Sequence, residues 1–369
     1  MKRLLLLGAL GMLMFFADPP VYACPLCLGG VVFAPGLQLD VADQAVIAAL
    51  VVGGTGWRII EVVKGSATAR HVLTDPVDGV DGAAMRARRP MLLLRHEQWP
   101  QWSSLGTIGA GYAGWLQQLL ATGPTADRAD VDWRARVALA ALHLEDPEPL
   151  AAAIAYGEIA RAPYGALRSL KSQLKAAIIA RWLDNPKLAD RRPAYTLLLG
   201  MAGGPADAER LEQRLEAAWT SRDATNLGAM LAADLELRGP SRAAWIETRY
   251  LADRNRTMPE IAAALQALSE HGKENGAVSR ERVIQAYRLL IRERQPMAAF
   301  VAGDLAAWEA WDATPEYVAV LTSNVVLDPA SRYAIINYLQ RSPRADAKAA
   351  LASLPVAERS LPVVPAQGK

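Results

Sequence analysis

The sequence predicts an α+β fold, in which a small β-rich barrel or sandwich is followed by a mostly α-helical solenoid. Short runs of Val, Ile and Leu surround a glycine cluster between residues 44 and 98. From Asp130 onward, apolar residues recur at helical spacing and alanine is frequent. Prolines stand at or near the first position of many of these helical segments, where the missing N–H does no harm.

Residues 1–23 have the order of a secretory signal. Lys2 and Arg3 precede an apolar stretch, Leu4–Phe16, and a helix-breaking segment then ends at Ala23. The apolar stretch is shorter than the about 20 residues that a membrane helix needs. We therefore expect a signal peptide cleaved after Ala23 and an exported, periplasmic or extracellular chain without a transmembrane span in its mature part.

The composition is that of an ordered globular protein with balanced charge. The 369 residues include 40 Lys and Arg against 38 Asp and Glu, and 52% are hydrophobic. This length allows two domains, at roughly 100–200 residues each. A nearly neutral chain lacks the basic footprint of nucleic-acid-binding proteins, so we do not expect nucleic acid as a partner.

Two cysteines, Cys24 and Cys27, follow the leader directly and are the only ones in the chain. In an oxidising compartment a local disulfide is the favoured interpretation. The Cys-Pro-Leu-Cys motif resembles the redox motif of thioredoxin-like enzymes, although Gly29 and Gly30 follow where those enzymes have a helix. A lipid anchor at Cys24 and a metal site also stay open, but no histidine has metal-ligand spacing, and we expect no metal or cofactor.

The segment 24–123 is predicted to form the β-rich domain. We expect strands near 45–52, 57–63 and 69–74, with a fourth beginning at Met91, because short β-branched runs flank a glycine cluster that suits a hairpin turn. The early cysteines followed by this strand pattern resemble the small barrels of the netrin-module and metalloproteinase-inhibitor class. The further disulfides of that class are lacking, so we expect no inhibitory role.

Gly109, Gly111 and Gly114 fit the G-x-G-x-x-G pattern of dinucleotide sites. Such a site needs a buried strand before the glycines and a second strand after the helix. The preceding stretch, QWPQWSSLG, is rich in turn-forming residues, and only helical segments follow. We therefore expect a loop that leads into a helix and no cofactor.

The segment 124–354 is predicted to be an α-helical repeat domain. Helical segments follow one another with short loops, which favours antiparallel neighbours; one of them is expected over residues 165–183. Adjacent pairs span about 35 to 45 residues and resemble HEAT repeats. Such pairs stack into a superhelix with a concave surface. The Pro-rich segment 355–369 is expected to be a disordered tail.

No nucleophile or general-base motif is present. His96 and Glu97 adjoin on a predicted strand, where neighbouring side chains point to opposite faces, so we expect no active site there. Glu158 lies on a mostly apolar helix and is expected to form a structural ion pair with Arg161 or Arg168. Trp245, Trp308 and Trp311, which lie in apolar helical stripes, are expected to pack in the core.

These observations together predict an exported protein-interaction scaffold without evident catalytic activity, whose partner is a protein or peptide of the cell envelope. The alternative is a thiol–disulfide redox protein that uses Cys24 and Cys27. The layout also resembles a group of uncharacterised bacterial exported proteins that carry a Cys-Pro-x-Cys motif after the leader, a small β region and HEAT-like helices.

Overall fold

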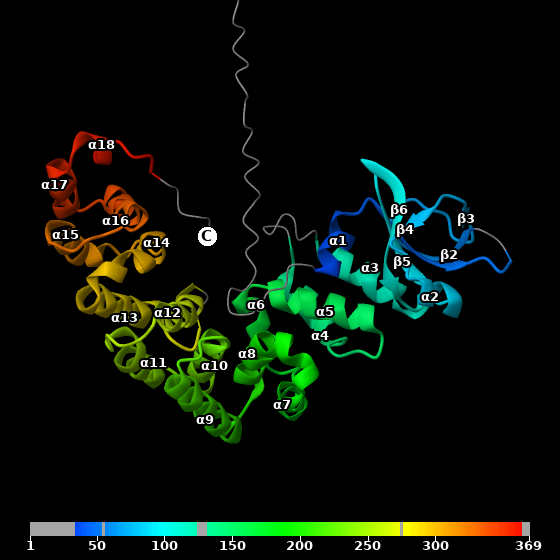
Figure 1. The fold of residues 1–369 in the computed structure, drawn as a ribbon, viewed down its shortest axis with the longest axis horizontal. Helices are drawn as coiled ribbons and strands as arrows, with labels where there is room; N and C mark the ends of the chain where they lie inside the picture. The colour runs from blue at the N-terminus through cyan, green and yellow to red at the C-terminus, as the bar shows by residue number, and fades with distance from the viewer. Residues whose placement is uncertain (1–33, 54–55, 124–130, 274–275, 364–369) are drawn as a thin grey trace, which may run out of the picture.

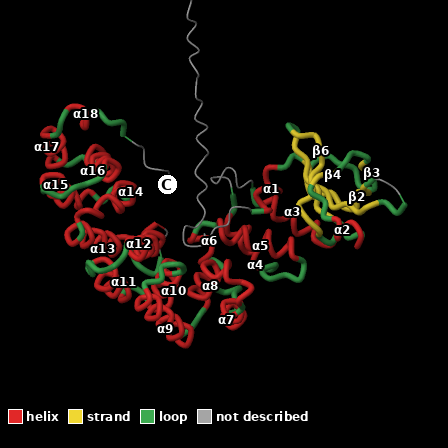
Figure 2. The backbone as a smooth tube through the Cα atoms, in the orientation of Figure 1, coloured by secondary structure: helices red, strands yellow, loops and turns green. Residues whose placement is uncertain are grey.

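The computed structural model describes residues 34–53, 56–123, 131–273 and 276–363. It has an α+β architecture, as predicted. A six-stranded mixed sheet lies at one end, and the rest of the described chain is mainly helical (Figures 1 and 2). The predicted signal peptide lies outside the described residues.

The strands form one curled sheet, a half-barrel, in the order β3-β2-β1-β5-β6-β4. All neighbouring pairs are antiparallel except β4 and β6. With β3 and β4 as open edges, the sheet is neither a closed barrel nor a sandwich. The strand bounds are β1 (Gln44–Leu50), β2 (Trp57–Lys64), β3 (Val72–Leu73), β4 (Val77–Asp78), β5 (Met91–His96) and β6 (Trp99–Thr107).

The two faces of the sheet belong to two apolar clusters, because successive side chains of a strand point to opposite sides. Ala45 and Ile47 of β1 join the large core that continues through the helices. Val46 and Ala48 join a smaller cluster with Trp102, to which the short helix α2 (Gly82–Ala87) contributes Ala84.

Strand β6 forms in the stretch QWPQWSSLG, where the sequence predicted turns, so that prediction was wrong. Pro100 lies where the register between β5 and β6 shifts, so its missing N–H costs no regular ladder bond. Trp102 is only 1% exposed and anchors β6 on the smaller cluster. Burial of this one aromatic ring thus outweighs the local preference for a turn.

Helices begin with α1 before the sheet and dominate after it. The bounds are α1 (Pro35–Val41), α3 (Ala113–Ala121), α4 (Trp133–Ala141), α5 (Pro149–Arg161), α6 (Tyr164–Arg168), α7 (Ala176–Asp184), α8 (Arg192–Ala202), α9 (Pro205–Ser221), α10 (Leu227–Arg238), α11 (Ser241–Ile246), α12 (Met258–Lys273), α13 (Arg280–Glu293), α14 (Ala302–Ala307), α15 (Thr314–Thr322), α16 (Pro329–Arg341), α17 (Ala345–Ser353) and α18 (Val356–Arg359). Short 3-10 segments η1 (Ala110–Tyr112), η3 (Pro186–Arg191), η5 (Gln295–Val301) and η6 (Trp311–Ala313) and a π-helical turn η4 (Glu247–Leu251) connect some of them. No helix within the described ranges is long and apolar enough to span a membrane.

The helix expected over residues 165–183 is instead two helices, α6 and α7. Leu170 is fully buried, and the chain turns around it through the polar residues 171–173 before α7 begins. A helix that continued through Leu170 could not follow this turn. Tertiary burial here overrides the uninterrupted helical spacing of the sequence.

The helices after α7 lie in two rows along an arc (Figure 1). An inner row contains α8, α10, α12, α14 and α16, and an outer row contains α9, α11, α13, α15 and α17. Within the inner row α10 packs against both α8 and α12, and within the outer row α13 packs against α11 and α15. These helices therefore pack against the next-but-one helix of the chain, which is their neighbour in the same row.

The inner row has a regular interval. Its segments α8, α10, α12, η5 with α14, and α16 begin at residues 192, 227, 258, 295 and 329, so the steps are 35, 31, 37 and 34 residues. Two of the steps are shorter than the 35 to 45 residues expected from the sequence. All four steps lie near the 34-residue length of tetratricopeptide repeats and below the roughly 40–47 residues of HEAT repeats.

Arginine–glutamate pairs join successive members of the outer row. Arg249 of η4 contacts Glu216 of α9 at 2.8 Å, and Arg288 of α13 contacts Glu316 of α15 at 2.7 Å. Between them, Glu247 of η4 pairs with Arg282 of α13. These pairs are partly exposed, so each contributes only about 0–1 kcal/mol.

Part of the predicted disordered tail is ordered. Helix α18 is held on α16 by Arg332, whose guanidinium contacts Glu358 at 2.8 Å. The Tyr333 hydroxyl also donates to the carbonyl oxygen of Pro362 at 2.6 Å. Residues 364–369 lie outside the described chain.

Four buried charged side chains join α1 to α4 and α5. Arg136 donates to both carboxylate oxygens of Asp40, at 2.8 and 2.9 Å, and to Glu158 at 2.6 Å. Arg161 contacts Asp40 at 3.2 Å and also pairs with Glu158. The expected pair between Glu158 and Arg161 is confirmed, whereas Arg168 contacts Glu236.

This charge cluster is neutral as a whole and almost dry. The side chains of Arg136 and Glu158 are 0% exposed, and that of Asp40 is 1% exposed. Burial lowers the pKa of the Arg136 guanidinium, but the carboxylates of Glu158 and Asp40 outweigh that effect and raise it above its ordinary value. Arg136 therefore stays charged, and α1 is fixed to the helices by a satisfied ionic contact.

We expect Arg136→Met to destabilise the protein by about 3–5 kcal/mol, because it leaves two buried carboxylates with one guanidinium. Urea unfolding followed by circular dichroism measures the loss. Arg134→Met is the matched control, since Arg134 is exposed on the same helix and should change stability by less than about 0.5 kcal/mol. Equal losses in the two variants would contradict a structural role for the cluster.

Gly200→Ala is expected to destabilise the contact between α8 and α10 by about 1–3 kcal/mol. A Cβ at position 200 would lie 2.5 Å from the Cα of Ala233, so the helices would have to move apart. Gly303→Ala in α14 is the control, because its Cβ would meet no atom within 4 Å and alanine favours the helix. Thermal unfolding should lower the melting temperature of the first variant only.

Candidate binding surface

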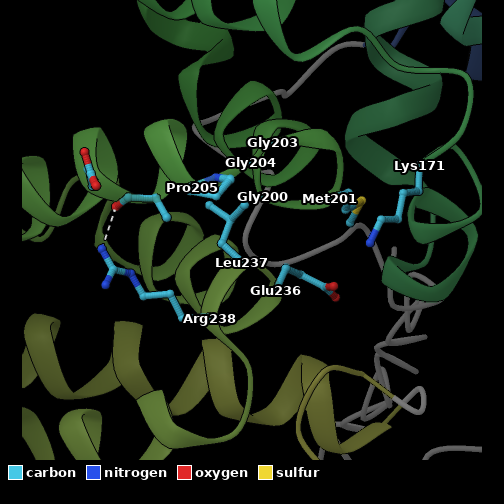
Figure 3. A pocket seen from close by; sticks show the side chains of 11 residues that line it. Lys171, Gly200, Met201, Gly203, Gly204, Pro205, Glu236, Leu237 and Arg238 are labelled. Carbon is cyan, nitrogen blue, oxygen red and sulfur yellow. Dashed lines mark hydrogen bonds between the residues drawn. The ribbon is translucent and has the colours of Figure 1, made fainter.

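A cavity of about 410 Å³ lies where the inner helices α8 and α10 end (Figure 3). Lys171, which follows α6, and Glu236 of α10 project toward the same space from opposite sides. The turn between α8 and α9 supplies main-chain groups of Gly203 and Gly204, and Glu209 of α9 completes the polar lining. The cavity thus combines charged side chains of both signs.

Glycine and proline shape this cavity. The missing side chain of Gly200 lets α8 approach α10 closely. Gly203 and Gly204 end α8, and Pro205 opens α9 at a position where it disrupts no helical bond. The Asp207 carboxylate accepts a hydrogen bond of 3.0 Å from the Gly204 N–H, which fixes the turn. The local sequence therefore holds the turn in one conformation.

Glu236 is held in place by its neighbours. It forms an ion pair with Arg168, whose Nε lies 2.6 Å from the carboxylate, and it accepts a hydrogen bond from the Tyr164 hydroxyl at 3.1 Å. Behind Tyr164, the fully buried His271 donates from Nε2 to the Ala232 carbonyl at 3.1 Å. Burial lowers the pKa of His271, so the imidazole is neutral at pH 7 and has a structural role.

Lys171 and Glu209 differ from Glu236 in that no described residue pairs with either side chain. Both are exposed at the rim of the cavity. None of the described lining residues is a serine, threonine, cysteine or histidine. The arrangement can bind polar and charged groups of a ligand.

Cys24 and Cys27 lie outside the described residues, so the disulfide, redox and lipid-anchor interpretations stay predictions. His96 ends β5, and Glu97 lies in the next turn, where its N–H donates to Asp43 at 2.6 Å. Neither side chain belongs to the cavity. Among the described residues, no three His, Cys, Asp or Glu side chains form a group that could hold a metal ion.

The glycine motif does have a strand before it and a helix after it, since β6 precedes it and α3 follows. It still lacks the geometry of a dinucleotide site. A Cβ at Gly111 or Gly114 would meet no atom within 4 Å, so neither glycine is needed for close packing of the helix against the strand. The described chain beyond β6 also contains no further strand.

Trp245, Trp308 and Trp311 are partly buried and pack against the large core, as predicted. The guanidinium of Arg242 stacks over Trp245, with its central carbon 4.0 Å from the ring centroid. These rings therefore stabilise the helical rows.

Tyr112, His143 and Asp146 form a cluster that was not predicted from the sequence. The Tyr112 hydroxyl donates to Asp146 at 2.6 Å, and His143 Nδ1 lies 2.8 Å from the other carboxylate oxygen. The hydrogen bond to Asp146, with burial, raises the pKa of Tyr112 to about 12. The imidazole packs on Trp115 with 4.2 Å between ring centroids. In the sequence, the dense polar segment HLEDPE, residues 143–148, is the pattern that could have indicated this cluster.

The same segment, 143–148, fastens the sheet to the helices. Glu148 contacts Arg89, which lies two residues before the start of β5, at 2.7 Å. Glu145 adopts a left-handed conformation with φ of 55°, and its carboxylate accepts from Arg191 and Tyr195. A strained residue with two partners indicates that this loop is held by its contacts. We interpret the Tyr112, His143 and Asp146 cluster as structural.

Comparison with protein-family models, with curated proteins and with solved structures finds no match to this chain. The geometry of the described residues therefore carries the functional argument.

Asp146→Asn should destabilise the protein by about 1–3 kcal/mol at pH 7, because hydrogen bonds from Tyr112 and His143 lose a charged acceptor. Burial acts to raise the pKa of Asp146, but these bonds and one from the Glu148 N–H lower it overall. The ionised carboxylate therefore stabilises the fold at pH values above about 4, the pKa of Asp in the unfolded chain. This contribution is lost as the pH falls through the lower pKa of Asp146 in the folded protein.

Urea unfolding of the wild type and the variant between pH 7 and pH 2.5 measures this difference. The gap in unfolding free energy should close at the acidic end. Asp190→Asn serves as the control, since the Asp190 side chain is exposed and forms no hydrogen bond with any described residue. A gap that is independent of pH would refute the assignment.

Proposed function

We propose that this protein is an exported interaction scaffold built on an α-solenoid, and that it binds a protein or peptide segment at the cavity between α8 and α10. The observation that carries the proposal is the pair of helical rows with steps of 31 to 37 residues in the inner row. Stacked helical pairs of this length offer extended surfaces for recognition. Whether the pairs belong with HEAT repeats or with shorter ones does not change this argument.

The chemistry of the cavity supports a polypeptide ligand. A peptide brings charged side chains that can pair with Lys171 and Glu209, whereas the N–H groups of Gly203 and Gly204 are already bonded to Leu199 and Asp207. Because Lys171 and Glu209 have no described partner, a ligand would not have to break an existing ion pair to reach them. Glu236, by contrast, is already bonded and would serve as a fixed wall.

The location of this activity follows from the leader. Export through residues 1–23 would place the scaffold in the periplasm or outside the cell, with an envelope protein or peptide as its partner. A lipid at Cys24 would add a membrane tether. The redox alternative rests on the Cys24 and Cys27 motif alone, and no described contact favours it.

Exchange of the two rim charges, Lys171→Glu with Glu209→Lys, tests the proposal without a change in net charge. Affinity chromatography of an envelope extract on the wild-type chain should retain a partner that this variant binds about tenfold more weakly, as expected for loss of a charged hydrogen bond. The control exchange, Arg134→Glu with Asp190→Lys, changes exposed charges outside the cavity and should retain the same partner. Equal retention by both variants would refute this cavity as the site.

A further inference from the structure

A groove lies where the outer helix α13 ends and the inner segment η5 begins. Two cavities of about 510 and 360 Å³ adjoin at Arg292 and Gln295. The larger is lined by Arg254, Arg292 and Arg294, and the smaller extends along α13 toward α15 past Arg288. We call this the arginine groove.

Positive charge exceeds negative charge in the larger cavity. Its lining has three arginines against the single carboxylate of Glu293, and one of the three, Arg292, also pairs with Glu316 of the adjoining cavity at 3.3 Å. The nearby Asp253 carboxylate is already engaged by Arg256 at 3.0 Å. The Arg254 side chain forms no hydrogen bond or ion pair with any described residue. Charge complementarity therefore favours an anionic ligand, with Arg254 free to receive it.

Arg294 is held where it can share that ligand. Its guanidinium donates to the Asp253 carbonyl oxygen at 2.8 Å, which fixes the side chain beside Arg254. Burial lowers the pKa of Arg294, and the positive charge of Arg254 adds to this effect against the opposing charge of Asp253. Two neighbouring cations repel one another, so an anion between them would relieve an existing cost.

The groove also has apolar walls. Met297 and Val325 line the larger cavity, and Ile291 lines the smaller one. Val326, next to this wall, is 91% exposed. A small inorganic anion would leave these surfaces in water, whereas a chain segment that carries carboxylates and an aliphatic side chain would cover them.

We propose that the arginine groove binds an extended acidic peptide segment, whose carboxylates pair with Arg254 and Arg294 and whose aliphatic side chain packs on Met297 and Val325. The groove is separate from the cavity at α8 and α10, and this inference does not rest on the function proposed for that cavity.

Fluorescence anisotropy of the full chain with a labelled, acetylated peptide of Glu and Asp residues around a central Leu tests the proposal. The peptide should bind, its affinity should fall as salt rises, and the matched Gln and Asn peptide should bind at least about tenfold more weakly. Arg254→Glu should reduce affinity for the acidic peptide by about tenfold or more. Arg134→Glu, an equal change of charge on α4, should leave it unaltered.

Replacement of the central Leu by Ser should weaken binding by several-fold, since it removes the aliphatic contact. Three outcomes would overturn the proposal: equal binding of the acidic and neutral peptides, unchanged affinity in Arg254→Glu, or preferential binding of inorganic phosphate or single-stranded DNA at the same site. Because Arg254 is exposed and unpaired, its substitution does not threaten folding.

Discussion

The junction between the sheet and the helical rows depends on the buried ionic contact of Asp40, Arg136, Glu158 and Arg161. It connects a helix that precedes the sheet with two helices that follow it. No single member can leave without stranding its partners in a dry environment. Gly36 belongs to the same constraint, because a Cβ at that position would collide with the Glu158 carboxylate. The cluster therefore fixes α1, which leads into the sheet, on α4 and α5, which lead into the helical rows.

Sequence patterns predicted the elements whose local and tertiary preferences agree. The strand pattern around the glycine cluster and the helical spacing after Asp130 both correspond to real elements, and Glu158 could be recognised as a buried partner of an arginine. The failures occur where distant packing decides. Trp102 turns a Pro- and Ser-containing stretch into a strand, and Leu170 breaks a continuous helical pattern.

Neither binding surface could be predicted from the sequence. The cavity at α8 and α10 exists because Gly200 meets Ala233 of a later helix, and periodicity alone does not set that contact. The arginine groove assembles Arg254 with residues around 292–297 and 325. Its members come from the end of α13, from η5 and from the loops that carry Arg254 and Val325, and the stacking of helices sets the positions of these segments. The net charge of the chain does not reveal the groove either, because a nearly neutral chain can still have a local excess of positive charge.

The outer-row pairs of arginine with glutamate have a mechanical consequence. Each joins adjacent helices alone and stays partly wet, so it can open and close while the apolar core remains intact. These pairs therefore add only weak resistance to a change in the curvature of the arc. A slight tilt at every step would accumulate into a large displacement between the two ends of the arc.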